Sequence, residues 1–399
     1  MSCNPRGWGP VQDIIIIGGG ISGVSATYEI ARAGHRVTLL EKTRLGAMAS
    51  GWTLGGVRQS GRHPVELPLA QAAVARWQTL DQELGLPTGY RQGGNLRLAR
   101  SEDEVATIRA LVAEQRALGL DLEFLPDLQA VRAVAPAVGD AVLAASFCAG
   151  DGHADPHASL AAYAAAAVRH GATIREGVAA HALLLDKGRV IGVETSAGAL
   201  HCDRVVVAAG VHAPELLGPR GISLPMMSKL VCVLQTVPTA PVFSQVFGVA
   251  NADAAGRQEL SGRFRVTNGI DDWSGDPTAW TQDSLQPRVR DIAALIGRVA
   301  QVLPGVADLG IARVWGGLID LTPDALPVID AHSGIDGLVI AAGFSGHGFG
   351  IGPVTGEILA ALTLGSETRF DLSGFRCDRF KVGHNGRGRP GQAPLTLHG

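Results

Sequence analysis

Three glycines and an acidic residue near the N-terminus have types and a spacing that suit a phosphate-containing ligand. Gly18, Gly20 and Gly23 form a GxGxxG pattern after the apolar run 14–17, and Glu41 follows Gly23 by 18 residues. The first glycine permits a tight turn out of a strand, the second lets backbone approach a pyrophosphate, and the third lets a helix pack closely on the sheet. N–H groups at the helix start attract phosphates, and an acid at this distance hydrogen-bonds a ribose hydroxyl. The pattern indicates an adenine dinucleotide, and a glycine-rich turn without a ligand is the alternative.

A second glycine-rich segment, residues 343–353, has a composition that suits a flat ring. It holds five glycines in eleven residues, follows the apolar run 337–343 and ends at Pro353. Proline is tolerated in the first turn of a helix, so we expect a helix from Pro353 to about Leu362. The backbone of such a loop can lie against a ring, and the helix dipole stabilises negative charge there. A reduced flavin carries that charge and a nicotinamide does not, so the segment favours a flavin. A tight crossover loop without a ligand is the alternative.

The hydrophobic pattern predicts the regular elements that position these two segments. Residues 12–17 and 36–40 have the pattern of buried parallel strands, and a helix is expected over 21–33 between them. The glycine- and serine-rich stretch 46–62 is expected to form no regular element. Further helices are expected over 68–84, 101–118, 156–171 and 287–303, and further strands over 189–195, 200–207, 230–237, 242–249, 262–266 and 337–343.

Composition limits the class of protein and its partners. A chain of 399 residues exceeds the size at which one core keeps growing, so two domains are expected. A net charge of −3 gives no reason to expect nucleic acid or an anionic membrane as a partner. No apolar run spans a bilayer, and residues 1–10 lack a secretory signal, so we expect a cytoplasmic protein. The five cysteines form no CxxC pair, and His153, His157 and His170 lack ligand-like spacing, so no metal is expected.

Taken together, these segments resemble the D-amino-acid-oxidase-like (DAO) family of FAD-dependent oxidoreductases. The similarity is greatest to the branch of sarcosine oxidase, hydroxyproline dehydrogenase and opine oxidase, and it covers about residues 12–375. The matching segments are 14–23 with Glu41, 55–59, 152–156, 205–210, 321–324 and 341–349. The resemblance implies an α/β fold: a Rossmann-like FAD-binding domain with an inserted, mostly antiparallel substrate domain whose sheet roofs the flavin.

The same resemblance implies domain boundaries and a set of cofactor contacts. The FAD-binding domain is expected to comprise residues 1–90, 146–215 and 323–380, and the substrate domain residues 91–145 and 216–322. The Gly-, Pro- and Arg-rich tail 381–399 is expected to be disordered. The residues expected to contact FAD are Gly18, Gly20, Ile21, Ser22, Gly23, Glu41, Lys42, Ser50, Gly55, Gly56, Val178, Ala209, Gly210, Gly343, Gly346, His347, Gly348, Phe349 and Gly350.

Three departures from the family pattern bear on the chemistry. Gly317 stands where monomeric sarcosine oxidases carry the cysteine that attaches flavin, so we expect FAD bound non-covalently. Gly350 stands where those enzymes carry a lysine that holds the substrate carboxylate. No tyrosine follows Tyr163, whereas D-amino acid oxidases proper use tyrosines from the later part of the substrate domain. This chain is therefore expected to differ from a simple D-amino acid oxidase.

The resemblance implies oxidation of a C–N bond, with the hydride equivalent passing from the carbon beside the amine to flavin N5. The substrate is expected to be a small amino acid or amine of the sarcosine, proline or hydroxyproline, opine or D-amino acid type. Its carboxylate needs a fixed cation, and arginine suits a planar carboxylate. Arg58 is the first candidate, Arg62 the second and Arg313 the third; a structural ion pair is the alternative for each. His347 is expected to lie near the flavin or to be a packed side chain, and His63 is a further candidate base.

Two other roles remain open from the sequence. Related opine and hydroxyproline enzymes work as hetero-oligomers, so this chain is a candidate flavin subunit of such an assembly. The alternative is an FAD-binding structural subunit whose catalysis occurs on a partner chain. A nicotinamide-linked dehydrogenase is disfavoured by segment 343–353.

Overall fold

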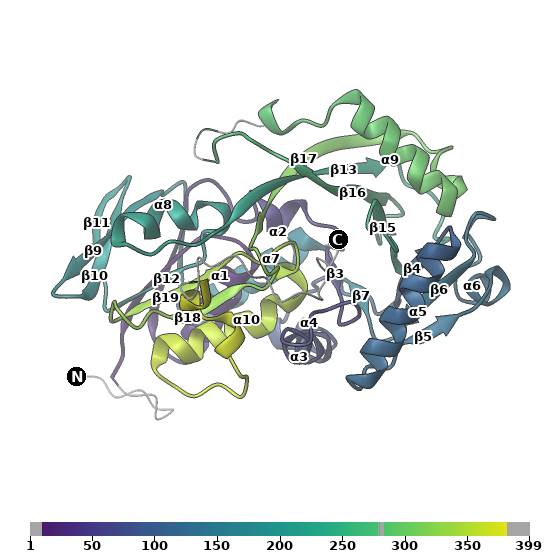
Figure 1. Cartoon of the computed structure of the whole chain (residues 1–399). Helices are drawn as coiled ribbons and strands as arrows, with labels where there is room; N and C mark the ends of the chain where they lie inside the picture. The colour runs from purple at the N-terminus through teal and green to yellow at the C-terminus, as the bar shows by residue number, and fades with distance from the viewer. Residues whose placement is uncertain (1–9, 278, 280–282, 381–399) are drawn as a thin grey trace.

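A six-stranded, mainly parallel sheet forms the centre of one half of the molecule in the computed structural model (Figure 1), which describes residues 10–277, 279 and 283–380. Its strand order is β18-β19-β12-β1-β2-β8, and the β18–β19 pair is antiparallel. Residues 14–17 are all buried, as expected for a parallel strand covered on both faces. The strands are β1 (Asp13–Ile17), β2 (Arg36–Glu41), β8 (Thr173–Glu176), β12 (Arg204–Val207), β18 (Val328–Ala331) and β19 (Leu338–Ala342). The strands expected over 12–17, 36–40 and 337–343 are confirmed.

Helix α1 (Ile21–Arg32) lies between α7 (Pro156–Arg169) and α10 (Gly348–Leu364) against this sheet. Small residues let α1 and α10 approach closely: a Cβ on Gly352 would lie 2.4 Å from Ile21 Cγ1, and one on Gly356 would lie 2.5 Å from Ser25 Oγ. Since α1 begins at the GxGxxG turn and α10 follows β19, this contact fixes the two glycine-rich segments relative to each other.

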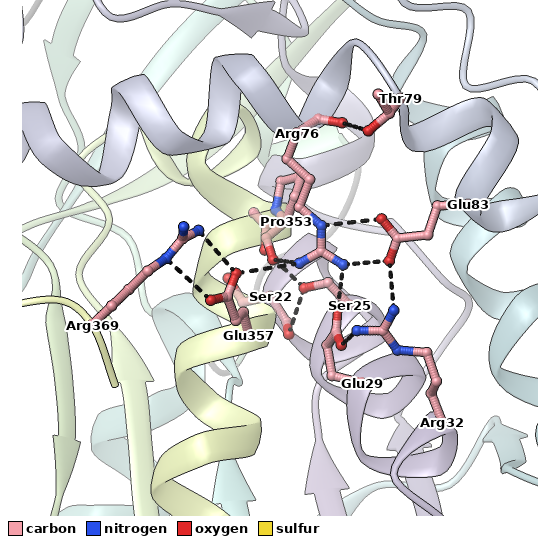
Figure 2. A network of polar contacts seen from close by, with 11 residues as sticks. Ser22, Ser25, Glu29, Arg32, Arg76, Thr79, Glu83, Pro353, Glu357 and Arg369 are labelled. Atoms are coloured by element: carbon pink, nitrogen blue, oxygen red, sulfur yellow. Dashed lines mark hydrogen bonds and ion pairs between the residues drawn. The ribbon is translucent and has the colours of Figure 1, made fainter. Parts of the chain in front are cut away.

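A network of charged side chains ties α1 and α10 to α3 (Leu67–Trp77) and α4 (Leu80–Leu84) (Figure 2). Arg76 is its centre: it contacts Glu29, lies 2.6 Å from Glu83 Oε1 and 3.8 Å from Glu357 Oε2, and donates to the carbonyl of Pro353 at 2.8 Å. Although burial opposes it, these carboxylates raise the pKa of Arg76. The network therefore holds four helices together on the side of the sheet where they pack.

An eight-stranded sheet forms the other half of the molecule, with order β17-β13-β16-β15-β14-β4-β6-β5. Its pairs are antiparallel except β14–β4. Helix α9 (Val289–Val302) covers its outer face at the top of Figure 1, where Leu295 and Val299 pack in one core with Phe264 and Val266. The strands are β4 (Asn95–Ala99), β5 (Glu123–Leu125), β6 (Ala144–Cys148), β13 (Met227–Thr236), β14 (Val246–Val249), β15 (Ala254–Gln258), β16 (Phe264–Asp272) and β17 (Ile311–Leu321).

The remaining elements are short and connect or flank the two large sheets. None of the described helices is both long and apolar enough to cross a membrane. These elements are helices α2 (Ala49–Trp52), α5 (Glu102–Ala117), α6 (Leu128–Val134) and α8 (Ala213–Leu217), the sheet of β9 (Ala180–Asp186), β10 (Arg189–Thr195) and β11 (Gly198–His201), the pair β3 (Gly56–Val57) and β7 (Gly152–His153), and 3-10 turns at Gly210–His212, Gly218–Arg220, Asp283–Leu285, Pro304–Val306, Ser373–Phe375 and Cys377–Phe380.

The predicted fold class is confirmed: a mainly parallel α/β sheet is combined with a mostly antiparallel one. Two helix predictions were wrong. The helix expected over 68–84 is two helices, because a tight turn closes where Thr79 N–H meets Arg76 O at 3.1 Å. Pro353 does not begin its helix but lies inside α10, which starts at Gly348. Gly352, the residue before Pro353, packs closely on α1, so this part of α10 is held by tertiary contacts.

Two further predictions of local structure need correction. The stretch 46–62 holds the short helix α2 and the strand β3, which pairs with β7. The strand expected over 200–207 is divided between two sheets, because Asp203 accepts the N–H of Asp13 at 2.8 Å and redirects the chain into the six-stranded sheet. The tail 381–399 lies outside the described residues.

Candidate functional site

The turn between β1 and α1 is so tight that only glycine fits at two of its positions. Gly18 has a φ of +113°, and a Cβ there would lie 2.3 Å from the carbonyl oxygen of Ala208. A Cβ on Gly23 would lie 1.9 Å from the carbonyl oxygen of Gly18. Gly20 precedes α1 and contributes no side-chain cap, and the N–H groups at such a helix start can bind an anion.

Glu41, at the end of β2, holds this turn in place. One of its carboxylate oxygens accepts the N–H of Gly19 at 2.8 Å. The other accepts the N–H and the hydroxyl of Thr43 at 2.8 and 3.0 Å. Ser50 Oγ accepts the N–H of Ile21 at 2.9 Å. Each carboxylate oxygen has two lone pairs, so Glu41 can orient the turn and still accept from a ribose hydroxyl.

One cavity connects this turn with the glycine-rich segment after β19. Gly18–Ser22 lie in its wall, as do Gly346, Gly348 and Phe349, and Val231, Val233 and Thr267 of the eight-stranded sheet line it as well. Two segments that are more than 300 residues apart in the sequence therefore face one space. The predicted cofactor residues in this wall are Gly18, Gly20, Ile21, Ser22, Glu41, Lys42, Ser50, Gly56, Val178, Ala209, Gly210, Gly346, Gly348 and Phe349.

Five other predicted cofactor residues lie outside the wall: Gly23, Gly55, Gly343, His347 and Gly350. The glycines among them are sites of close packing. Gly55 has a φ of +74°, and its Cβ would lie 2.3 Å from the carbonyl oxygen of Ala154. Gly343 has a φ of +68°, and its Cβ would lie 2.4 Å from Thr322 Cγ2. These positions shape the site through backbone geometry.

Lys42 lies in the cavity wall beside two residues that the sequence did not predict. Its Nζ is 3.0 Å from His212 Nε2, and His212 Nδ1 is 2.6 Å from Glu215 Oε1. All three line the cavity. Lys42 follows Glu41 in the sequence, and His212 and Glu215 come shortly after Gly210. They supply polar side chains at the end of the cavity where the nucleotide is expected. For His212 and Glu215, the only signal in the sequence was their position after a strand that ends in small residues.

Arg58 and Arg62 both lie in the cavity wall and are buried, with 5% and 3% of their surface exposed. Arg62 Nε donates to the carbonyl of Arg58 at 3.4 Å, so the two side chains share one loop. Burial lowers the pKa of Arg58 to about 9, and the charges of Arg62 and Arg97 contribute. At neutral pH the pair is therefore a buried cationic region in the cavity wall.

Arg97 is a third buried arginine that the sequence analysis missed. It lies on β4, has 5% of its surface exposed, and makes no hydrogen bond or ion pair with any described residue. Burial lowers its pKa to about 10, and the charge of Arg62 adds to this effect. The signal was present in the sequence, since a single arginine interrupts the otherwise uncharged strand Asn95–Ala99.

Asp151 is a fully buried acid next to this loop, and the sequence analysis missed it too. It accepts the N–H groups of Gln59 and Ser60 at 2.8 and 3.2 Å and also contacts the Ser60 hydroxyl. Burial raises its pKa from the ordinary value. Its hydrogen bonds fix the backbone between Arg58 and Arg62, so it positions the cationic side chains.

The two histidines named from the sequence lie outside the cavity wall. His347 precedes α10, and its Nδ1 is 3.1 Å from the carboxylate of Glu66, which is fully buried and precedes α3. Burial lowers the pKa of His347, which favours a neutral ring that donates from Nδ1 to Glu66. His63 Nδ1 accepts the N–H of Val65 at 3.1 Å. His347 therefore connects the start of α10 to the start of α3 through its contact with Glu66.

Arg313 is separate from the other candidate arginines. It lies on the exposed end of β17, outside the cavity wall, with its guanidinium 5.5 Å from the ring centre of Trp315. Arg58 and Arg62 come together and Arg313 does not join them. In the described residues, no three His, Cys, Asp or Glu side chains form a group that could hold a metal ion.

The residues around the cavity fit an FAD molecule. The turn at Gly18–Gly23 and the carboxylate of Glu41 suit a pyrophosphate and a ribose. Gly346 and Gly348 present backbone without side chains at the start of α10, where a flat ring can approach. Gly317 also lines the cavity and carries no thiol, and a Cβ there would lie 2.8 Å from Trp52 Cε3.

Comparison with known proteins gives similarity along nearly the whole chain. The chain is 26% identical to 4-methylaminobutanoate oxidase (formaldehyde-forming) of Paenarthrobacter nicotinovorans, over 94% of this chain and 46% of that protein. It therefore spans about half the length of that relative. It is 27% identical to glycine oxidase of Geobacillus kaustophilus, over 93% of this chain and 98% of that protein. It is 26% identical to sarcosine oxidase subunit beta of an Arthrobacter species, over 93% and 92%.

Solved structures and a family model give the same result. L-proline dehydrogenase from P. horikoshii superposes with a TM-score of 0.84 at 26% identity, covering 93% of this chain and 98% of that one. The family model described as FAD dependent oxidoreductase matches residues 13–362. The chain therefore belongs to this FAD-dependent oxidoreductase family, as its resemblance to D-amino-acid-oxidase-like proteins predicted.

Proposed function

We propose that this protein oxidises the C–N bond of an amino acid or N-substituted amino acid that it holds by its carboxylate. One observation carries the proposal: Arg58 and Arg62 are buried in the wall of the cavity that both glycine-rich segments line. Three relatives support the substrate class, since their names refer to glycine, sarcosine and L-proline.

The charges around the arginine loop support an anionic substrate. Arg58, Arg62 and Arg97 are all buried and act on one another through their charges, and the charges of Asp151 and Glu66 act on Arg58. Glu66 is engaged with His347, and Asp151 with backbone N–H groups. Arg62 and Arg97 have no carboxylate within ion-pair distance among the described residues, and a buried cation is more favourable beside an anion, so a substrate carboxylate would be stabilised here. An amino acid supplies one such carboxylate.

The residues of the chain have mainly orienting roles in this reaction. FAD, when bound, supplies the acceptor for the hydride equivalent. Arg58 and Arg62 would bind the substrate carboxylate through paired N–H donors and so fix the carbon to be oxidised. Val231, Val233 and Val246 line the same cavity and would exclude water from that carbon. The imine product would leave and hydrolyse in water.

Anaerobic mixing tests the proposal directly. The FAD-loaded protein would be mixed with sarcosine, glycine, proline, hydroxyproline, opines and D-amino acids, and loss of the yellow flavin absorbance would be followed. We expect at least one of these amines to bleach the flavin, and simple amines without a carboxylate to leave it oxidised. Bleaching by hydroxy acids and by no amine would contradict the C–N assignment.

A second candidate role is the flavin subunit of a hetero-oligomer, favoured by two relatives that are named sarcosine oxidase subunit beta. A structural subunit without catalysis of its own is the competing form of this role. Replacement of Arg58 separates the two: a catalytic subunit would lose substrate-driven bleaching in the Arg58→Ala variant, and a structural subunit would not change. The mass of the protein purified from its native source would show whether partner chains accompany it.

We also propose that FAD is held without a covalent bond, because Gly317 provides no thiol. Release of FAD when the protein is precipitated with acid would test the absence of a covalent link.

The proposed domain boundaries follow the two large sheets. Strands of the six-stranded sheet come from 1–90, 146–215 and 323–380, and those of the eight-stranded sheet from 91–145 and 216–322, except that β6 crosses residue 146.

A further inference from the structure

Asp320 is a carboxylic acid in the cavity wall that the proposed reaction does not use. It lies near the end of β17 and has 7% of its surface exposed. It forms no ion pair with any described residue. By contrast Asp324, four residues later, pairs with Arg379 at 2.8 Å and is not in the cavity wall. A buried acid without a cation in a ligand cavity requires an explanation.

Asp320 is hydrogen-bonded to the loop between β19 and α10 through both its side chain and its backbone. Its Oδ2 accepts the N–H of Gly343 at 2.8 Å, and its backbone carbonyl accepts the N–H of Ser345 at 2.9 Å. Both bonds reach the start of the segment that carries Gly346 and Gly348 into the cavity wall. Asp320 therefore determines where this backbone lies.

This loop has a backbone conformation that needs such support. Gly343, Ser345 and Gly346 have φ values of +68°, +53° and +83°. Ser345 is not a glycine, so its conformation carries a cost that the surroundings must offset. Its hydroxyl oxygen accepts the N–H of Thr322, the residue after β17, at 3.2 Å, which is a third hydrogen bond between this part of the chain and the loop.

The electrostatic setting of Asp320 is also specific. Burial raises its pKa to about 6, and the N–H groups of Gly343 and Phe344 only partly oppose this. At neutral pH the group is thus largely a carboxylate, and no basic side chain in the described part of the chain forms an ion pair with it. The start of α10, four residues from Phe344, provides the positive end of a helix dipole in the same region.

We propose that Asp320 positions the loop 343–348 against the FAD ring and that its negative charge lowers the reduction potential of the bound flavin. The reason for the second part is electrostatic. A reduced flavin carries negative charge, so a carboxylate in the same cavity disfavours reduction relative to an uncharged side chain of equal shape. This inference depends on FAD binding and does not depend on the identity of the substrate.

The test uses the FAD-loaded full chain and three variants. Asp320→Asn keeps the shape and an acceptor for Gly343 but removes the charge. Asp320→Ala removes the acceptor as well. Asp324→Asn is the matched control, because it removes a carboxylate four residues away that does not line the cavity. The reduction potential would be measured by dithionite titration beside a dye of known potential, with FAD in excess and no substrate present. FAD affinity would be measured by flavin fluorescence on dilution.

We expect the reduction potential of the flavin to be higher in Asp320→Asn than in the wild type. Each tenfold change in the equilibrium constant of the two-electron reduction corresponds to about 30 mV. Asp320→Ala is expected to bind FAD about tenfold more weakly or worse, since the N–H of Gly343 loses its partner. Asp324→Asn should match the wild type in both measurements. A potential of Asp320→Asn equal to or below that of the wild type would overturn the proposal, even if Asp320→Ala does not fold. Because no substrate is used, this result is independent of the proposed reaction.

Discussion

Two groups of arginines, one partly buried between helices and one buried at the cavity, show how this chain uses the same side chain in opposite ways. Arg76 lies among three carboxylates and a backbone carbonyl, in the contact between helices that Figure 2 shows. Arg62 and Arg97, in or behind the cavity wall, have no carboxylate within ion-pair distance among the described residues. Arg76 has its pKa raised, whereas the pKa of Arg97 is lowered to about 10.

The difference separates stability from function. Arg76 links several helices through their carboxylates, and its removal should destabilise the fold because buried Glu29 loses one of its partners. A buried guanidinium without carboxylates costs stability until an anion binds. We therefore interpret the group with Arg76 as structural and the group with Arg62 as a site kept ready for a ligand.

Removal of Arg76 should give the largest loss of stability. Arg76→Ala leaves Glu29, which has 6% of its side chain exposed, with Arg32 at 2.6 Å as its one remaining ion-pair partner among the described residues. Loss of one member of a buried pair costs about 3–5 kcal/mol, and we expect a value at the lower end because Arg32 remains. Urea denaturation would measure the free energy of unfolding, and the rate of flavin reduction in the folded protein should be unchanged.

The same network provides the control for Arg76. Arg369 lies 3.4 Å from Glu357, and both side chains are well exposed. Exposed pairs contribute about 0–1 kcal/mol, so Arg369→Ala should barely change the free energy of unfolding. If Arg76→Ala and Arg369→Ala lowered the free energy of unfolding equally, the burial of Glu29 would not determine the size of the effect.

Removal of Arg62 should have the opposite profile, with a large effect on substrate use and no loss of stability. If Arg62 binds the substrate carboxylate, Arg62→Ala should weaken that contact by about 2 kcal/mol or more, which is about 30-fold in the apparent affinity for the substrate. Arg62→Lys keeps the charge without the paired donors and should lie between. Anaerobic flavin reduction at varied substrate concentration would measure both. Wild-type affinity in Arg62→Ala would remove this arginine from the site.

Asp320 extends the comparison to an acid, with a pH dependence of known sign. Its pKa of about 6 in the folded state exceeds the ordinary value of 3.8, so the folded state favours the protonated form. The resulting contribution to the free energy of unfolding is fully present below pH 3.8 and is lost as the pH rises through 6. At pH 8 the buried carboxylate should therefore cost about 3 kcal/mol, which Asp320→Asn would relieve. FAD-free Asp320→Asn should be more stable than the wild type at pH 8 and similar to it near pH 4. Thermal unfolding across this range would show it, and a constant difference would contradict it.

Local sequence patterns were enough to predict the parts of the fold that depend on neighbouring residues. The turn from β1 to α1 followed from glycine spacing, because the steric demand at Gly18 and Gly23 is nearly local. The position of Pro353 inside α10 did not follow, because it depends on packing against α1, which begins more than 300 residues earlier. The split of 68–84 likewise depends on a turn that has no glycine or proline to mark it.

The candidate site shows the same limit. Arg58 and Arg62 were predicted because they belong to a segment with a family resemblance, and they do line the cavity. Asp151 and Asp320 were missed because each acts on a loop that is distant in the sequence: one on Gln59 and Ser60, the other on Gly343. A single acid in an apolar strand, as at Asp320, is the sequence signal that would have identified it.

The smallest expected effect is that of Arg313, and it sharpens the comparison because sequence reasoning ranked it with Arg58 and Arg62. Arg313 is exposed and lies over the ring of Trp315, outside the cavity wall. Exposed charges contribute little, so Arg313→Ala should change stability by less than about 1 kcal/mol and substrate affinity by less than about threefold. The measurements are the urea denaturation and flavin reduction used for Arg76 and Arg62. A loss of affinity as large as that of Arg62→Ala would mean that β17 moves to bring Arg313 to the substrate, and that burial in this structure does not identify the carboxylate-binding arginines.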